Sequence, residues 1–164
     1  DYMGMLGTVM NSLALQSNLE KIGVASRVMT AISINRVAEP YIKNKATKHL
    51  QKDRVVIFAS GTGNPFFSTD TAAVLRASEM KSDIILKGTK VDGIYDKDPM
   101  TSNNAKKIAQ ISYAEYLSQD IKVMDATAIS LAKDRGLPII IFSIMNSSNI
   151  IDIIDGKGSY SIIK

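Results

Sequence analysis

Continuous apolar runs alternate with helix-forming segments along this chain, and this alternation is the feature that most constrains its fold. Short apolar runs at residues 54–59, 83–88 and 138–142 are typical of strands that are buried on both faces. Segments with apolar residues at helical spacing separate them, as at 72–81 and 126–135. The pattern predicts an α/β fold, a three-layer αβα sandwich with a mostly parallel central sheet.

The remaining segments extend this alternation. The further elements that we expect are a strand at 26–34, a last edge strand at 158–163, and helices at 3–22, at 40–53 beginning at Pro40, after the capping box of Ser112 and Glu115, and at 149–155. No internal repeat, low-complexity tract or linker divides the chain. We therefore expect residues 1–164 to form a single domain.

The residue counts exclude several kinds of site. The chain has no cysteine, so it holds no disulfide, cysteine nucleophile or cysteine metal site. Its single histidine, His49, lies beside lysines, and we expect a surface residue rather than a member of a Ser-His-Asp triad. The longest apolar stretch, residues 137–145, is too short to cross a bilayer, and no signal peptide is visible. We expect a cytoplasmic protein that binds no membrane.

The net charge of +4 is spread along the chain, with a mild cluster of lysines at 43, 45, 48 and 52. On a helix, this spacing is more typical of a solvated face than of a nucleic-acid footprint. We therefore expect no nucleic-acid partner. The excess of positive charge suits small phosphorylated ligands without requiring them.

The loop between the strand at 54–59 and the helix at 72–81 has a composition suited to anions. Residues 60–71 contain two glycines, a proline and several hydroxyl residues. Unpaired N–H groups and the helix dipole converge at a helix N-terminus, where both favour a negative charge. On composition alone, an ordinary strand-to-helix loop with a Ser or Thr cap remains the alternative.

A second loop, residues 89–99, is too long for a simple crossover. Its Asp-Gly and Asp-Pro pairs are turn signals, so two successive turns are one interpretation. In the other interpretation, its carboxylates pair with ribose hydroxyls or with a magnesium-bound phosphate, and Tyr95 stacks on a base. Both loops follow strands at their carboxyl ends, where ligands gather in parallel α/β sheets.

Two common nucleotide-binding motifs are absent from the sequence. Without G-x-x-x-x-G-K-[ST] the chain is not an ordinary P-loop kinase, and without G-x-G-x-x-G a dinucleotide-binding Rossmann domain is disfavoured. The pattern D-G-x-Y-x-x-D-P at residues 92–99 is instead similar to the nucleotide-binding loop of the amino acid kinase superfamily, which includes the aspartate, glutamate-5- and acetylglutamate kinases.

A finer resemblance concerns residues 61–70, Gly-Thr-Gly-Asn-Pro-Phe-Phe-Ser-Thr-Asp, which resemble the acceptor loop of the bacterial uridylate kinases (UMP kinases). Segments 1–6, 90–93 and 122–125 are similar to other parts of these enzymes, in the same order. The resemblance covers essentially the whole chain. It implies transfer of the γ-phosphoryl of ATP to UMP, giving UDP and ADP, in pyrimidine nucleotide biosynthesis.

The resemblance also implies roles for individual residues. The residues that would bind UMP are Asp1, Thr62, Gly63, Asn64, Pro65, Phe66, Phe67, Ser68 and Thr69. Those that would bind ATP are Thr89, Tyr95 and Asp98, with Mg²⁺ held mainly through the ATP phosphates and no dedicated metal site in the protein. A homohexamer, inhibition by UTP and activation by GTP are implied as well.

Two acidic residues have a structural alternative. Asp1 would contact the ribose of UMP by resemblance, and would be a plain helix cap by its position. Asp125 is the N-cap of the helix at 126–135 by its position. By resemblance, Asp125 would instead face the active site as a catalytic residue that orients a lysine or the metal.

Two departures from the family pattern keep other functions open. Gly88 stands where alanine is frequent. The family's N-terminal part, with a lysine that contacts the transferring phosphate and a Gly-rich loop, has no match in residues 1–164, so we expect an N-terminally incomplete amino acid kinase domain. The alternatives are another kinase of this superfamily that acts on a carboxylate or carbamate, and a non-catalytic nucleotide-binding module on the same fold.

Overall fold

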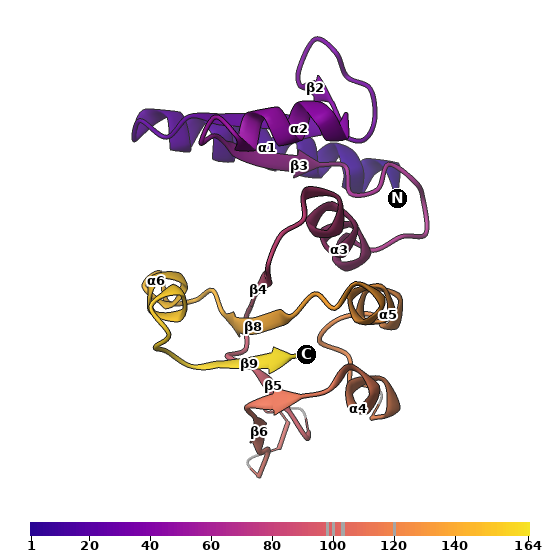
Figure 1. Ribbon diagram of the computed structural model, residues 1–164, viewed down its shortest axis with the longest axis vertical. Helices are drawn as coiled ribbons and strands as arrows, with labels where there is room; N and C mark the ends of the chain where they lie inside the picture. Colours follow the sequence, from indigo (N-terminus) through magenta and orange to yellow (C-terminus); the bar gives the residue numbers. More distant parts are fainter. Residues whose placement is uncertain (98, 100, 103, 120) are drawn as a thin grey trace. The chain divides into compact units, whose positions relative to one another are not determined.

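The computed structural model describes residues 1–97, 99, 101–102, 104–119 and 121–164. The chain forms two compact units, Asp1–Lys81 and Ser82–Lys164 (Figure 1). Each unit has its own sheet and its own helices. Within the described residues, no helix is long and apolar enough to span a membrane.

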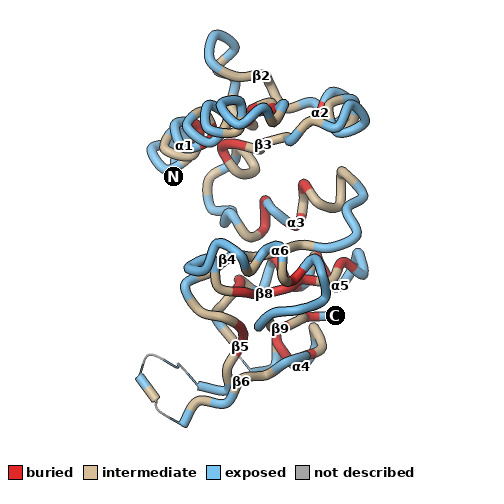
Figure 2. The backbone as a smooth tube through the Cα atoms, turned by 90° about the vertical axis from the view of Figure 1, so that its left-hand side faces the viewer, coloured by how far each residue is buried: buried red, intermediate tan, exposed pale blue. Residues whose placement is uncertain are grey.

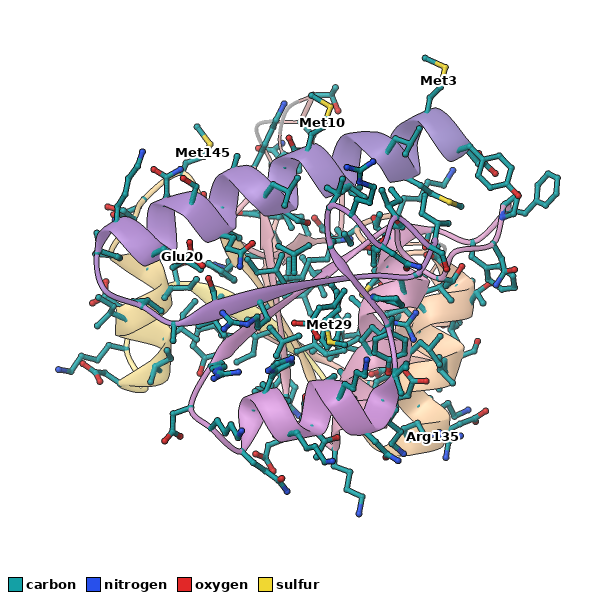
Figure 3. All side chains as sticks on the ribbon, turned by 90° about the horizontal axis from the view of Figure 1, so that it is seen from above. Met3, Met10, Glu20, Met29, Arg135 and Met145 are labelled. Atoms are coloured by element: carbon teal, nitrogen blue, oxygen red, sulfur yellow. The ribbon has the colours of Figure 1, made fainter. Side chains whose placement is uncertain are left out.

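The first unit is built on a three-stranded parallel sheet. Its strands are β1 (Ser26–Thr30), β2 (Glu39–Pro40) and β3 (Val55–Ala59), in the order β2-β1-β3, and its helices are α1 (Tyr2–Lys21), α2 (Lys43–Leu50) and α3 (Thr69–Met80). Figure 3 shows α1 and α2 on opposite sides of the strands. Because Thr30 pairs with Ala59, β1 and β3 end side by side, and the segments that follow them start from the same edge.

The core of this unit lies between α1 and the sheet. Val9 of α1 packs with Val28 and Ala59, and all three are buried. Burial of one such valine side chain contributes about 1.5–3 kcal/mol. Met29, which alternates with Val28 along β1, is fully buried on the other face and lies in the middle of the unit in Figure 3. The end of β3 is therefore a firmly packed base for the loop that follows Ala59.

The second unit contains a four-stranded sheet in the order β4-β8-β9-β7 and a two-stranded hairpin. The sheet strands are β4 (Ile85–Thr89), β7 (Gln110–Ile111), β8 (Ile139–Ser143) and β9 (Tyr160–Ile163), the hairpin strands are β5 (Ile94–Tyr95) and β6 (Lys107–Ile108), and the helices are α4 (Tyr113–Ser118), α5 (Ala126–Arg135) and α6 (Asn149–Ile154). β8 is the most buried strand of this unit (Figure 2), as its unbroken apolar run predicts. On one face, Ile140 and Phe142 pack against Ile153 of α6.

The predicted α/β class with mostly parallel strands is confirmed: β4 and β8, β7 and β9, and all pairs of the first sheet are parallel. The prediction of an edge strand at residues 158–163 is wrong, because β9 pairs with both β8 and β7 and runs antiparallel to β8. Its polar Ser161 is fully buried and donates a hydrogen bond to the Ile108 carbonyl.

The predicted helix at residues 40–53 begins later than expected. Pro40 lies in β2, and α2 starts at Lys43. Proline cannot donate to a strand ladder, and β2 lies at the edge of the sheet, where that loss is tolerated. The backbone N–H of the next residue, Tyr41, donates to the Thr30 carbonyl at 2.9 Å and fixes the segment to β1.

Candidate functional site

The turn that follows β3 has a backbone conformation that costs free energy. Ser60 and Gly61 have φ angles of 66° and 58°, and for a residue with a side chain the left-handed region costs about 1–2 kcal/mol. Ser60 is fully buried, so its polar groups need partners. Its N–H donates to the Thr8 hydroxyl at 2.8 Å, and its own hydroxyl lies 2.9 Å from that of Thr30. Contacts with α1 and β1 thus hold this turn.

The next residues of the loop form a tight turn of their own. The Thr62 hydroxyl accepts the N–H of Asn64 at 3.1 Å and donates to the Asn64 carbonyl at 3.3 Å. Between them, Gly63 has a φ of 81°, and a Cβ there would lie 3.0 Å from the Ala31 carbonyl oxygen. Glycine is required at this position both by its conformation and by the close approach of the segment after β1.

The loop ends at the N-terminus of α3, and the predicted hydroxyl cap is present. Ser68 is the N-cap, and its hydroxyl accepts the N–H of Thr71 at 3.0 Å. An acidic residue, Asp70, lies in the first turn, where the helix dipole favours a negative charge. The ordinary hydroxyl cap predicted from composition is therefore present at the start of α3.

Asp1 is tied to this loop rather than to its own helix. Its carboxylate makes no capping bond to α1 but accepts the N–H of Phe66 at 2.8 Å, across 65 residues of sequence. Phe66 has a φ of 71°, so the bond supports the second residue of the loop, after Ser60, that is left-handed without being a glycine. The side chain of Phe66 is 99% exposed, so the backbone of this residue, and not its ring, takes part in the contact.

A pocket of about 340 Å³ lies between the start of α1 and this loop. Five of the nine residues predicted to bind UMP line it: Asp1, Thr62, Asn64, Phe67 and Thr69. The other four, Gly63, Pro65, Phe66 and Ser68, belong to the same loop without lining the pocket. The further lining residues, which the sequence did not indicate, include Gly4 and Thr8 of α1. Gly4 and Thr8 lie on the same face of the helix as Asp1, because residues three or four positions apart are neighbours on a helix surface. The sequence could have indicated them only if Asp1 had already been known to line the pocket.

The second loop of interest begins at the end of β4 and is held by a network of polar side chains. Thr89 makes a turn like that of Thr62: its hydroxyl accepts the N–H of Val91 at 3.0 Å and donates to the Val91 carbonyl at 2.7 Å. The hydroxyl of Tyr95 donates to Asp92 at 2.6 Å. The other carboxylate oxygen of Asp92 accepts from Lys107 and from Ser159, each at 2.9 Å.

These bonds hold Asp92 in its ionised form. The hydrogen bond from Tyr95, followed by those from Lys107 and Ser159, lowers the pKa of Asp92 far below its usual value, although burial acts in the opposite direction. The same contact raises the pKa of Tyr95. Gly93 lies beside this network, and a Cβ there would come within 2.5 Å of Lys107 and Ser161. The Asp-Gly pair is therefore more than a turn signal: Asp92 accepts the hydrogen bonds of the network, and Gly93 leaves room for Lys107 and Ser161.

A pocket of about 450 Å³ in the second unit is lined by this loop. Its walls include Val91, Tyr95, Pro99, Ile121 and Val123, an apolar set with the flat ring that a base requires, and Lys122 lies beside them. Of the residues predicted to bind ATP, Tyr95 lines this pocket, Thr89 does not, and Asp98 lies outside the described residues.

Asp125 is the N-cap of α5, as its position predicted. Its carboxylate accepts the N–H of Ala128 at 2.9 Å, and Gly136 ends the helix in the left-handed conformation. Its catalytic role stays a prediction. His49 is more covered than expected, with 15% of its side chain exposed; it lies 3.2 Å from Glu39 and 3.1 Å from Arg54.

Comparison with known proteins places these loops in a family. The family model described as "Amino acid kinase family" matches residues 1–143. A uridylate kinase from Neorickettsia sennetsu is 52% identical over the whole chain, which covers 70% of that protein, and one from Roseobacter denitrificans is 54% identical over the whole chain, which covers 68%. The crystal structure of UMP kinase from Ureaplasma parvum matches with a TM-score of 0.96 at 38% identity, over 100% of this chain and 70% of the other.

These matches confirm the resemblance that the two loops indicated, in sequence and in fold alike. They extend over both units, so neither loop is an isolated likeness. The chain therefore belongs to the amino acid kinase family, within which its relatives in Neorickettsia and Roseobacter are uridylate kinases.

Proposed function

We propose that the chain catalyses the transfer of the γ-phosphoryl of ATP to UMP, giving UDP and ADP, and that the pocket between α1 and residues 60–69 holds UMP. The observation that carries this proposal is the contact between Asp1 and the loop, where the carboxylate of Asp1 accepts the N–H of Phe66. Asp1, Thr62, Asn64 and Thr69 line one pocket. These residues come from distant parts of the sequence, and the uridylate kinase resemblance had grouped them independently of any structure.

The chemistry of the pocket suits a nucleoside monophosphate. A carboxylate accepts hydrogen bonds from ribose hydroxyls, while hydroxyl groups and the N-terminus of α3 favour the phosphate. Phosphoryl transfer needs positioning and charge stabilisation more than covalent help, and the acceptor oxygen of UMP is already ionised. No general base is required, which agrees with His49 lying in a structural contact with Glu39 and Arg54.

We assign ATP to the pocket beside β5 in the second unit, with its base against Tyr95 and the apolar wall. Mg²⁺ usually binds through one or two carboxylates together with substrate phosphates, and when bound it would neutralise the charge of the ATP phosphates. Among the described residues, no group of three or more acidic or histidine side chains is arranged to hold a metal ion. Asp125 is our candidate for orienting it, in addition to capping α5.

The proposal extends to assembly and regulation. We take both units as parts of one kinase domain in a cytoplasmic homohexamer that UTP inhibits and GTP activates. The apolar side chains of Met3, Leu6 and Met10 on α1 are exposed, and Figure 3 shows both methionines pointing away from the helix, as a contact with a further copy would require. The two effectors rest on the resemblance alone.

Titration calorimetry tests the UMP site. We expect saturable binding of UMP, with CMP binding at least about tenfold more weakly, because the loop would recognise the base as well as the phosphate. Asp1→Asn removes a charge from the pocket and should weaken UMP binding. Asp134→Asn, the same change at an exposed position of α5, should leave it unchanged. Equal binding of UMP and CMP would refute uridylate specificity, and binding of neither to a folded sample would refute the site.

A further inference from the structure

Arg76 is a buried charged residue that lies next to the proposed UMP site without lining it. It belongs to α3, and only 8% of its surface is exposed. Removing a guanidinium group from water is costly unless its N–H groups are paired. The contacts that offset this cost show which parts of the unit Arg76 connects.

The guanidinium group of Arg76 makes three separate contacts. One nitrogen donates to the Glu79 carboxylate at 2.7 Å, one turn further along α3. Another nitrogen donates to the Gly61 carbonyl at 3.3 Å. The plane of the group lies over the ring of Tyr41, 3.7 Å from its centroid. Arg76 thereby links α3 to the first turn of the loop and to the segment between β2 and α2.

Glu79 is held as the charged partner of Arg76. Burial would raise its pKa, but hydrogen bonds from Tyr41 and Arg76 outweigh burial and lower it. The hydroxyl of Tyr41 donates to the same Glu79 oxygen at 2.5 Å, and its ring meets Phe58 of β3 edge to face. Arg76, Glu79 and Tyr41 therefore contact one another, and the second terminal nitrogen of Arg76 remains available to donate to the loop.

The Gly61 carbonyl is the point at which this cluster reaches the loop. Ser60 and Gly61 are the two successive left-handed residues, and their turn directs residues 62–69 toward Asp1. Thr8 and Thr30 hold the Ser60 side of this turn. Arg76 of α3 holds the Gly61 side through its bond to the Gly61 carbonyl.

We propose that Arg76 is a positioning residue for the acceptor: by fixing the Gly61 carbonyl it holds residues 62–69 in the conformation that binds UMP, without touching UMP itself. The inference rests on the proposed UMP site. Loss of one charge-assisted hydrogen bond corresponds to about a tenfold change in an equilibrium constant. A loop freed from Arg76 should therefore bind UMP about tenfold more weakly, while the ATP site in the other unit keeps its affinity.

The test compares Arg76→Met and Arg76→Lys with the wild type and with Arg135→Met, which removes the same charge from an exposed position that Figure 3 labels at the end of α5. The readouts are the Kd of UMP by calorimetry and KM for UMP and for ATP in the whole protein. We expect both Arg76 variants to raise the Kd and KM of UMP, Arg76→Met by about tenfold and Arg76→Lys by less, since lysine keeps the charge but not the planar fork. KM for ATP should not change.

The outcomes separate the positioning role from a merely structural one. A structural role would lower the fraction of active protein, and hence kcat and binding stoichiometry, at an unchanged Kd for UMP; that result in either variant would overturn the inference. If Arg76→Met does not fold, Arg76→Lys decides by the same measurements. Absence of UMP binding to the wild type would refute the proposed function instead, and wild-type binding that neither Arg76 variant alters would refute only the role of Arg76.

Discussion

Gly63→Ala adds a single carbon to the loop and tests whether the close approach of Ala31 constrains the conformation of residues 60–69. Replacement by alanine places a Cβ 3.0 Å from the Ala31 carbonyl oxygen and 3.1 Å from the Ala31 Cβ, at a φ of 81°. The neighbouring atoms belong to the backbone and to a short side chain, so they cannot rotate away. The segment after β1 or the loop itself must move.

The cost has two parts. The left-handed conformation costs a residue with a side chain about 1–2 kcal/mol, partly offset by about 0.4–1 kcal/mol from the lower entropy of the unfolded alanine chain. Forcing an extra carbon into a packed site costs about 1–3 kcal/mol more. We therefore expect Gly63→Ala to lower the free energy of unfolding by about 2–3 kcal/mol, which corresponds to about 5–10 °C in Tm for a chain of this size.

Gly136→Ala is the matched control. Gly136 has a φ of 60°, and a Cβ there would meet nothing within 4 Å, so this variant carries only the conformational cost. We expect a loss of about 1 kcal/mol, or about 2–4 °C in Tm, by thermal unfolding under the same conditions. In calorimetry, Gly63→Ala should also weaken UMP binding, whereas Gly136→Ala should not. Equal losses of stability in the two variants would refute the argument, because the close approach to Ala31 would then place no constraint on the loop.

Two further predictions concern ionisable groups. Because the pKa of Asp92 is lowered in the folded protein, its contribution to stability is present above about pH 4 and is lost as the pH falls toward the lower folded pKa. Asp92→Asn should therefore make Tm fall less steeply as the pH drops below about 5, as measured by thermal unfolding at a series of pH values. The same dependence of Tm on pH in the variant and the wild type would contradict the hydrogen-bond network around Asp92. Burial, together with Glu79, raises the pKa of Tyr41 to about 12. An ultraviolet titration should show that Tyr41→Phe removes a component ionising near that value; loss of a component near pH 10 would contradict the cluster with Arg76.

Local chemistry could be predicted from sequence because it depends on neighbours in the chain. The unbroken apolar run that ends at Phe142 predicted β8, and Ser112 with Glu115 predicted the capping box that starts α4. Asp125 predicted the start of α5, where its side chain caps the helix. In each case the hydrogen bond or packing face lies within a few residues, so the pattern alone specifies it.

Sequence patterns were weaker where the partner is distant. Alternation at residues 158–163 predicted an edge strand, but the partner of Ser161 lies in the β5–β6 hairpin, and no local signal distinguishes a hydroxyl facing water from one facing a carbonyl. The same limit applies to Asp92. The Asp-Gly pair predicted a turn from sequence alone. The hydrogen bonds of Asp92 with Lys107 and Ser159, in contrast, form only when the whole unit has folded.

The sequence by itself determined the α/β class, the composition of both loops and the family, since these depend on residue types in a fixed order. The tertiary structure decided which of those residues act together. The carboxylate of Asp1 accepts the N–H of Phe66 across 65 residues of sequence, and Arg76 of α3 donates to the Gly61 carbonyl across 15. Such contacts arise only after α1, β3 and α3 have packed on one another, because the free energy that holds a strained turn comes from partners that the packed core brings within hydrogen-bonding distance.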